Sequence, residues 1–121
     1  MKTANVIERV RQRREFASTE EAEEVTAATL EALGRVVPAD DARNVAVELP
    51  PELAQRLRAP EDRDSTDSVD EFLAYVHDNA SVREAGVEWK VNGVFDVLEE
   101  TVGDEFADVQ AQLPDEYDRL R

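Results

Sequence analysis

Apolar residues recur along the chain every three or four positions, which is the period of an amphipathic helix rather than of a strand. In the first half this spacing predicts four helices, each starting after a residue that can cap it or at a proline. The expected caps are Thr3, Ser18 and Asp40, and Pro50 with Pro51 starts the fourth helix. The faces expected to be buried carry Val6, Ile7, Val10, Ala22, Val25, Thr29, Leu30, Leu33, Val37, Ala42, Val45, Ala46, Leu49, Leu53 and Leu57.

The second half repeats this order of signals. Ser68 with Glu71, and Ser81 with Glu84, have the spacing of a capping box. Gly103 marks the end of a helix, after which Asp104 can cap the next one. The positions expected to face the core here are Val69, Phe72, Leu73, Val76, Ala80, Phe106, Val109, Leu113, Tyr117 and Leu120.

Residues 87–97 carry two competing signals. Their apolar positions alternate around Asn92-Gly93, a strong hairpin turn, yet the valines also follow helical spacing. A glycine inside a helix costs about 1 kcal/mol relative to alanine, so local propensity favours the hairpin. An internal repeat aligns these residues with 27–33, where no turn signal occurs, and we therefore predict a helix.

That repeat is the strongest pattern in the chain. Residues 45–53 (VAVELPPEL) align with 109–117 (VQAQLPDEY) at an offset of 64, which also pairs Leu30 with Val94. Val6, Ile7 and Val10 align with Phe72, Leu73 and Val76 at an offset of 66. Neither unit is long enough to bury its own apolar face, so the two should share one core. We predict a single all-α domain over 1–121, a bundle of about seven or eight helices in two pseudo-symmetric repeats (3–58 and 68–121) joined by a polar linker (59–67).

Composition removes several kinds of chemistry. The chain has no cysteine and one histidine, which excludes disulfides, thiolate metal sites, thiol nucleophiles and histidine-rich zinc or triad sites built from this chain alone. No apolar run approaches the ~20 residues that a bilayer span needs, and no signal-peptide core is visible. We therefore expect a cytoplasmic protein that does not enter a membrane.

The net charge of the chain indicates the kind of environment in which the protein works. Fourteen basic residues against 29 acidic ones give a net charge of −15, and all but two of the basic residues are arginines. Acid-rich, lysine-poor composition is typical of cytoplasmic proteins from salt-loving microbes, because carboxylates stay hydrated while molar salt shortens the Debye length to ~3 Å. An ordinary acidic protein is the alternative.

The repeated Leu-Pro-x-Glu elements resemble those of a bacterial and archaeal family known as DUF2267. Its "AxQLPxEL"-like motif is matched at Ala46–Leu53 and at Ala111–Tyr117, and its longer second-half pattern is matched best from Gly103 to Leu120. The likeness covers nearly the whole chain, and with the composition it indicates a haloarchaeal-type member. It implies a small all-helical protein of two similar halves, and it brings no activity, cofactor or catalytic residue.

Arg9, Arg11, Arg13 and Arg14 form the basic cluster of the sequence. On a helix, Arg9 and Arg13 share a face. The cluster can pair with the acidic second half or a second copy, pair with a partner's acidic surface, or simply be solvated. Nucleic acid is not an expected partner, because a net charge of −15 repels phosphates at long range.

The remaining candidates have stronger structural explanations. His77 is expected at the surface or boundary of its helix, and Trp89 in core or half-exposed packing. The acidic runs match solvated helix starts, and residues 62–67 lack the glycine of a calcium loop and contain Arg63. We therefore expect no metal site, no cofactor and no catalytic residue.

These observations predict a non-catalytic helical interaction or scaffold module that binds a protein partner or a second copy of itself. The alternative is a small-ligand binder or enzyme that uses carboxylate and arginine groups in the groove between the two repeats. The absence of a convergent set of titratable residue types makes an enzyme the less favoured of the two.

Overall fold

The protein is all-helical over the residues that the computed structural model describes, which are 2–16, 18–58, 68–80 and 84–120. This confirms the predicted fold class. Residues 87–97 lie within one helix, so the helix prediction is confirmed and the hairpin is not formed. The predicted linker 59–67 and the cap Ser81 lie outside the described residues. The elements are α1 (Thr3–Arg13), α2 (Thr19–Val36), α3 (Ala39–Ala46), α4 (Pro51–Arg58), α5 (Val69–Asn79), α6 (Glu84–Val102), α7 (Asp104–Gln112) and the 3-10 helix η1 (Asp115–Leu120).

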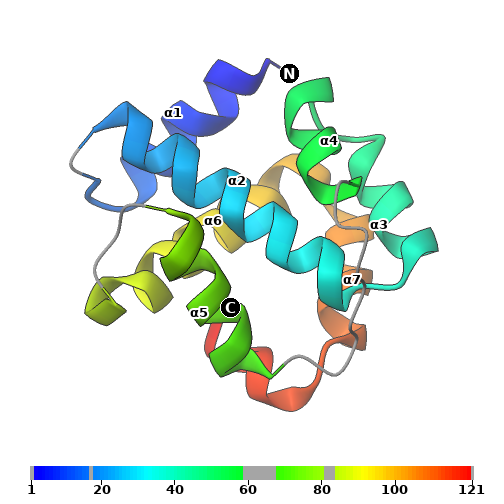
Figure 1. Ribbon diagram of the computed structural model, residues 1–121. Helices are drawn as coiled ribbons and strands as arrows, with labels where there is room; N and C mark the ends of the chain where they lie inside the picture. The colour runs from blue at the N-terminus through cyan, green and yellow to red at the C-terminus, as the bar shows by residue number, and fades with distance from the viewer. Residues whose placement is uncertain (1, 17, 59–67, 81–83, 121) are drawn as a thin grey trace.

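The two long helices form the centre of the molecule. Helix α2 packs against α1, α4, α5 and α6, and α6 packs against α1, α5, α7 and η1 as well as α2. In Figure 1 α2 crosses in front of α6, with α4 on one side of it and α5 on the other. The described helices of both halves contribute to one hydrophobic cluster. Each half therefore covers apolar surface of the other.

Aromatic rings make the core of the second half. Phe72 lies edge-to-face with Phe95 at 6.1 Å and with Tyr117 at 5.6 Å, and Phe95 does the same with Phe106 at 5.4 Å. All four side chains are at most 1 % exposed. Because they come from α5, α6, α7 and η1, this ring chain joins every described helix of the second half.

The predicted serine caps match the observed helix starts, whereas the predicted threonine and aspartate caps do not. Ser18 accepts a hydrogen bond from the Glu21 backbone N–H at 3.1 Å, and Ser68 with Glu71 forms a complete capping box. Thr3 and Asp104 are instead the first residues of their helices and Asp40 the second residue of its helix, so these three cap predictions were wrong. The observed caps are Lys2, Pro38 and Gly103. Asp40 and Asp104 still favour these helix starts, because negative charge in the first turn complements the helix dipole.

We expect Ser68→Ala to lower the free energy of unfolding by about 1 kcal/mol, the usual cost of losing a side-chain cap. The Ser68 hydroxyl accepts from the Glu71 backbone N–H at 3.1 Å, and alanine cannot replace that acceptor. Chemical denaturation of the two proteins at equal salt measures the difference. Ser68→Thr, which keeps the hydroxyl, serves as the control and should lose less.

The halves contain helices in the same order and of similar length. The lengths are 11, 18, 8 and 8 residues in the first half against 11, 19, 9 and 6 in the second. Along the long helices buried positions coincide at an offset of 65, which pairs Leu30 with Phe95 rather than with Val94. That the two backbones superpose stays a prediction. The coinciding pairs are Ala22/Val87, Thr26/Val91, Ala28/Gly93, Thr29/Val94, Leu30/Phe95, Ala32/Val97 and Leu33/Leu98.

Candidate interaction surfaces

The four arginines of the basic cluster do not share one role. Arg9 is exposed and has no ion pair or hydrogen-bonded side-chain partner within the described part of the chain. Arg11 pairs with Glu8 one turn earlier on α1, at 2.6 Å, and both side chains are 44 % exposed. An exposed pair of this kind holds its partners only weakly. The Arg9 and Arg11 guanidinium groups are therefore at most weakly paired, and they give the outer face of α1 positive charge.

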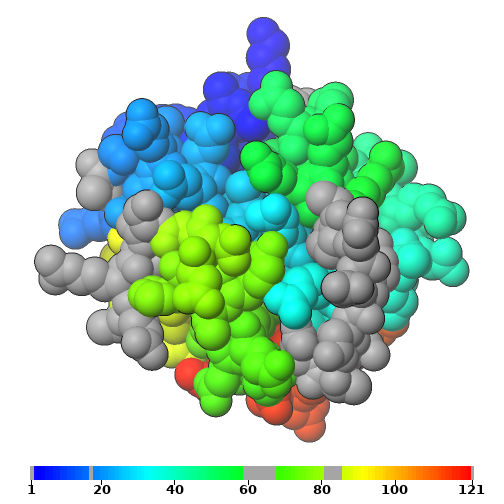
Figure 2. All heavy atoms as spheres, in the orientation of Figure 1, coloured from blue at the N-terminus to red at the C-terminus, as the bar shows by residue number. Residues whose placement is uncertain are grey.

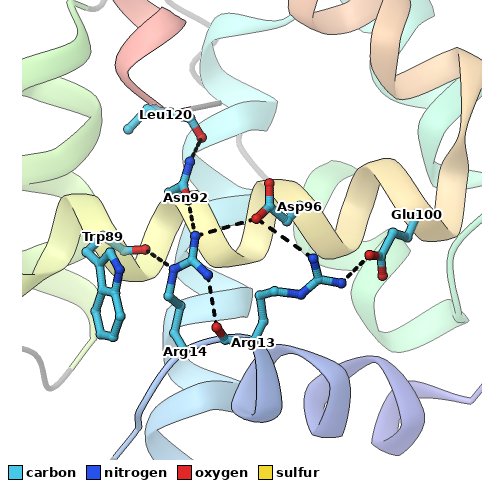
Figure 3. A network of polar contacts seen from close by, with 7 residues as sticks. All are labelled: Arg13, Arg14, Trp89, Asn92, Asp96, Glu100 and Leu120. Carbon is cyan, nitrogen blue, oxygen red and sulfur yellow. Dashed lines mark hydrogen bonds and ion pairs between the residues drawn. The ribbon is translucent and has the colours of Figure 1, made fainter.

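Arg13 and Arg14 reach across to α6 and form the network drawn in Figure 3. Arg13 pairs with Glu100 and lies 3.9 Å from Asp96. Arg14 donates from Nε to the Trp89 backbone carbonyl at 3.2 Å and from Nη2 to the Asn92 side-chain oxygen, and it lies 3.5 Å from Asp96. The end of α1 is thus attached to the middle of α6 by charge-assisted hydrogen bonds.

Asn92 and Gly93, the residues that gave the hairpin signal, serve this network. Asn92 accepts from Arg14 and donates to the Leu120 backbone carbonyl at 2.9 Å, which connects the end of α1 to the end of the chain. A Cβ at position 93 would lie 2.5 Å from the Arg14 Cγ, closer than real Cβ contacts come. Packing therefore explains why a glycine occurs inside this helix: because Gly93 has no Cβ, the Arg14 side chain can lie directly on α6.

Trp89 is half-exposed, in keeping with the expectation of core or half-exposed packing. Its side chain is 51 % exposed, and the Arg14 guanidinium lies 5.4 Å from the ring centroid. A shallow hollow of about 500 Å³ lies between this ring and residues 11–16 at the end of α1. Exposed indole beside guanidinium groups is a composition found at protein interfaces.

The other candidates lie where plain structural explanations place them. His77 is 39 % exposed, at the surface of α5, and its Nδ1 lies 3.4 Å from the Asp78 carboxylate. Within the described side chains no group of three or more His, Asp or Glu is arranged to hold a metal ion. The acidic residues 62–67 lie outside the described part of the chain. No described helix is long and apolar enough to cross a bilayer.

A groove that we did not predict from the sequence runs along the exposed stripe of α2. We call it the α2 groove; it has a volume of about 650 Å³ and lies between α2, α4 and the ends of α1 and α5. Figure 2 shows this face, with the side chains of α2 between those of α4 and α5. Of the described residues that line it, all but one come from the first half, the exception being Asn79. Its carboxylates belong to Glu20, Glu23, Glu24, Glu31 and Glu52, and its apolar surface to Ala27, Ala28 and Leu53.

The charge of the α2 groove is strongly negative. Among the described residues that line it, Arg56 is the one cation, and the Arg56 guanidinium lies 3.6 Å from the Glu31 carboxylate. A second hollow of similar size continues past Glu23 and Glu52 toward Ile7, Pro50 and Pro51. In both hollows acidic side chains surround small apolar residues, and we call these acidic side chains the acidic rim. Charge and shape both suit a cationic side chain with an aliphatic stem.

Shifted pKa values in the described residues have surface ion pairs or partial burial as their cause. The hydrogen bond from Arg11 lowers the pKa of Glu8, and the hydrogen bond to Glu100 raises the pKa of Arg13. The hydrogen bond to Glu88 raises the pKa of Arg119 in the same way. Burial raises the pKa of Tyr75. These groups lie on α1, α5 and η1, and none of them is among the described residues that line the α2 groove.

Comparison with known proteins gives one family. The family model described as "Uncharacterized conserved protein (DUF2267)" matches residues 3–120, almost the whole chain. A search of curated proteins finds no match.

Proposed function

The chain belongs to the DUF2267 family, and we propose that this member is a non-catalytic interaction module that works in a salt-rich cytoplasm. The α2 groove is the observation that carries the proposal. It is open, lies on regular helices, and combines an apolar floor with a rim of five carboxylates. Such a surface suits docking of a partner's cationic segment rather than enclosure of a small substrate.

The arginine cluster contributes less to this function than the sequence suggested. Arg13 and Arg14 are already paired with α6, so a partner would have to compete with contacts inside the protein. In the α2 groove Arg56 pairs with Glu31 at 3.6 Å and its side chain is 55 % exposed, so a partner would compete there with an exposed ion pair. The small-ligand alternative would use the hollow between the two halves, which lies between residues 11–16 and Trp89 and has a smaller volume, about 500 Å³ against about 650 Å³ for the α2 groove.

Composition supports the salt-rich setting. With a net charge of −15, mutual repulsion between carboxylates opposes folding at low ionic strength. Molar salt screens that repulsion, because it shortens the Debye length to about 3 Å. We therefore expect the melting temperature to rise steadily from low to molar KCl. Thermal melts followed by circular dichroism test this, and a melting temperature that falls over the same range would refute the salt-adapted assignment.

Affinity capture from native extract held at molar KCl tests the interaction function. The baits are the wild-type protein, the groove variant Glu23→Gln/Glu52→Gln and the control Glu99→Gln/Asp108→Asn, which removes two exposed charges elsewhere. We expect a stoichiometric partner with the wild type and the control, and its loss with the groove variant. A partner retained equally by all three baits, or by none, would contradict the proposal.

A further inference from the structure

Trp89 is a large aromatic side chain that the folded chain leaves open to solvent. Among the large apolar residues that the structure describes, Trp89 and Val47 are the two that are mostly exposed, at 51 % and 66 %. A Cβ placed on Gly86, one turn earlier on α6, would have no neighbour within 4 Å, so the helix surface next to Trp89 is open as well. Half of the indole therefore remains in contact with water in a single copy, at a cost that burial against another surface would remove.

The indole borders the hollow of about 500 Å³ described above, which we call the Trp89 hollow. Its other described lining residues are 11–16, the last residues of α1 and the three that follow. Phe16 is the second aromatic residue there and packs against the core, with the Lys90 ammonium 5.2 Å from its ring centroid. The Arg14 guanidinium lies beside the indole and bonds to Asn92 (Figure 3). Because contacts inside the protein already hold these side chains, a binding partner would have to order few of them.

The Trp89 hollow differs in charge from the chain as a whole. Three arginines and one glutamate are among the described residues that line it, whereas the whole chain has a net charge of −15. The carboxylates of Glu8, Asp96 and Glu100 pair with these arginines, which brings this end of the molecule close to neutrality. Tryptophan and arginine are enriched at the centre of protein interfaces, and unpaired acidic residues are depleted there.

We propose that a second copy of this chain covers Trp89, in a two-fold arrangement in which the indole of each copy lies in the Trp89 hollow of the other. Charge selects this occupant. Two copies of net charge −15 repel each other over most of their surface, and the Trp89 hollow is a place where the charges are already paired. Pockets of its volume hold molecules larger than an indole. In a two-fold contact each indole meets the guanidinium groups of the other copy, which is a favourable cation–π arrangement.

Other partners suit this place less well. A strongly acidic protein would have to displace Asp96 and Glu100 from Arg13 and Arg14, and it would be repelled by the rest of the chain. A basic protein would meet three guanidinium groups in the hollow itself. A second copy meets neither obstacle, because it brings the same balanced set of charges.

The dimer leaves the α2 groove free. The α2 groove and the Trp89 hollow share none of the described residues that line them. The dimer therefore presents two α2 grooves, and a partner with two matching segments gains avidity from it. This inference goes beyond the proposed function, and either one can fail alone. The groove variant Glu23→Gln/Glu52→Gln should dimerise as the wild type does.

Sedimentation equilibrium and Trp89 fluorescence in molar KCl test the dimer over protein concentrations from about 1 µM to 1 mM. We expect a reversible monomer–dimer equilibrium with a dissociation constant of about 10–100 µM, so that dilute samples are monomeric. Because Trp89 is the only tryptophan, its emission should shift to shorter wavelength and its quenching by acrylamide should fall over the same range. A protein that stays monomeric up to about 1 mM would overturn the inference, even if another protein from the extract shields Trp89.

Two pairs of variants locate the contact by sedimentation. Trp89→Ala should weaken dimerisation at least about tenfold, whereas Val47→Ala, at the other exposed apolar residue, should leave it unchanged. Arg11→Glu should weaken dimerisation because it disturbs the charge balance beside the hollow. Arg43→Glu is its matched control, since both arginines pair with an exposed carboxylate three residues earlier, and it should have no effect.

Melting curves of dilute protein show whether each variant is folded. Dimerisation that Trp89→Ala leaves intact would overturn the inference. Equal weakening by Arg11→Glu and Arg43→Glu would also overturn it, because the effect would then come from net charge and not from the Trp89 hollow.

Discussion

Replacing Phe95 by alanine is expected to lower the free energy of unfolding by about 3–5 kcal/mol, the largest effect of any single change considered for this protein. The Phe95 side chain is 1 % exposed and contacts both Phe72 and Phe106. Alanine would leave a cavity where α5, α6 and α7 meet and would interrupt the chain of edge-to-face rings. A loss of this size is a large fraction of the 5–15 kcal/mol that stabilises an ordinary domain.

Chemical denaturation at molar KCl measures this loss, and Trp89→Ala is the matched aromatic control. Because Trp89 is 51 % exposed, its truncation should cost far less. Circular dichroism and Trp89 fluorescence should report one coincident transition in the Phe95 variant, since both halves contribute to the same apolar cluster. A Phe95→Ala cost below about 1 kcal/mol would contradict this description of the core.

Gly93→Ala is expected to destabilise the protein by about 1–3 kcal/mol, although alanine is the better helix former. The new Cβ would lie 2.5 Å from the Arg14 Cγ, near the base of that side chain, where rotation of its far end gives no relief. Arg14 must leave α6, and its hydrogen bonds to Asn92 and to the Trp89 carbonyl are lost. The loss exceeds the gain of about 1 kcal/mol in helix propensity.

The sign of this effect should depend on Arg14. In an Arg14→Ala background the clash is absent, so Gly93→Ala should stabilise the protein by up to about 1 kcal/mol. Gly86→Ala is the control on the same helix, because a Cβ at position 86 has no neighbour within 4 Å, and it should be neutral or stabilising in both backgrounds. If the effects of the Arg14 and Gly93 changes on the free energy of unfolding were additive, the close contact between position 93 and the Arg14 side chain would contribute nothing to stability.

The helices could be predicted from the sequence because their signals are local or repeated. Spacing and serine caps located most elements, and the internal repeat decided α6 against a hairpin signal at Asn92-Gly93. What local reasoning could not supply was the tertiary reason for that pair, since Arg14 lies 79 positions before Gly93 and contacts it only in the folded chain. Gly93 is in the helix because another side chain needs its space, and not because the chain turns there.

The α2 groove was missed for a related reason. Glu20, Glu23, Glu24 and Glu31 match an ordinary solvated face, and nothing in the sequence says that α4 stands beside them. The offset between corresponding helix starts falls from 66 for α1 and α5 to 65 for the next two pairs and to 64 for α4 and η1, because the three connections of the second half are one, one and two residues shorter while α6 and α7 are each one residue longer.

Hydrogen–deuterium exchange of the protein in the complex isolated at molar KCl tests the central claim most directly, namely that the α2 groove is where a partner binds. We expect slower amide exchange on partner binding in the exposed turns of α2 over 20–31 and in α4 over 52–56, with α7 unchanged. Added protection confined to α7 or to the end of α1 around Trp89, with α2 and α4 unaffected, would contradict it.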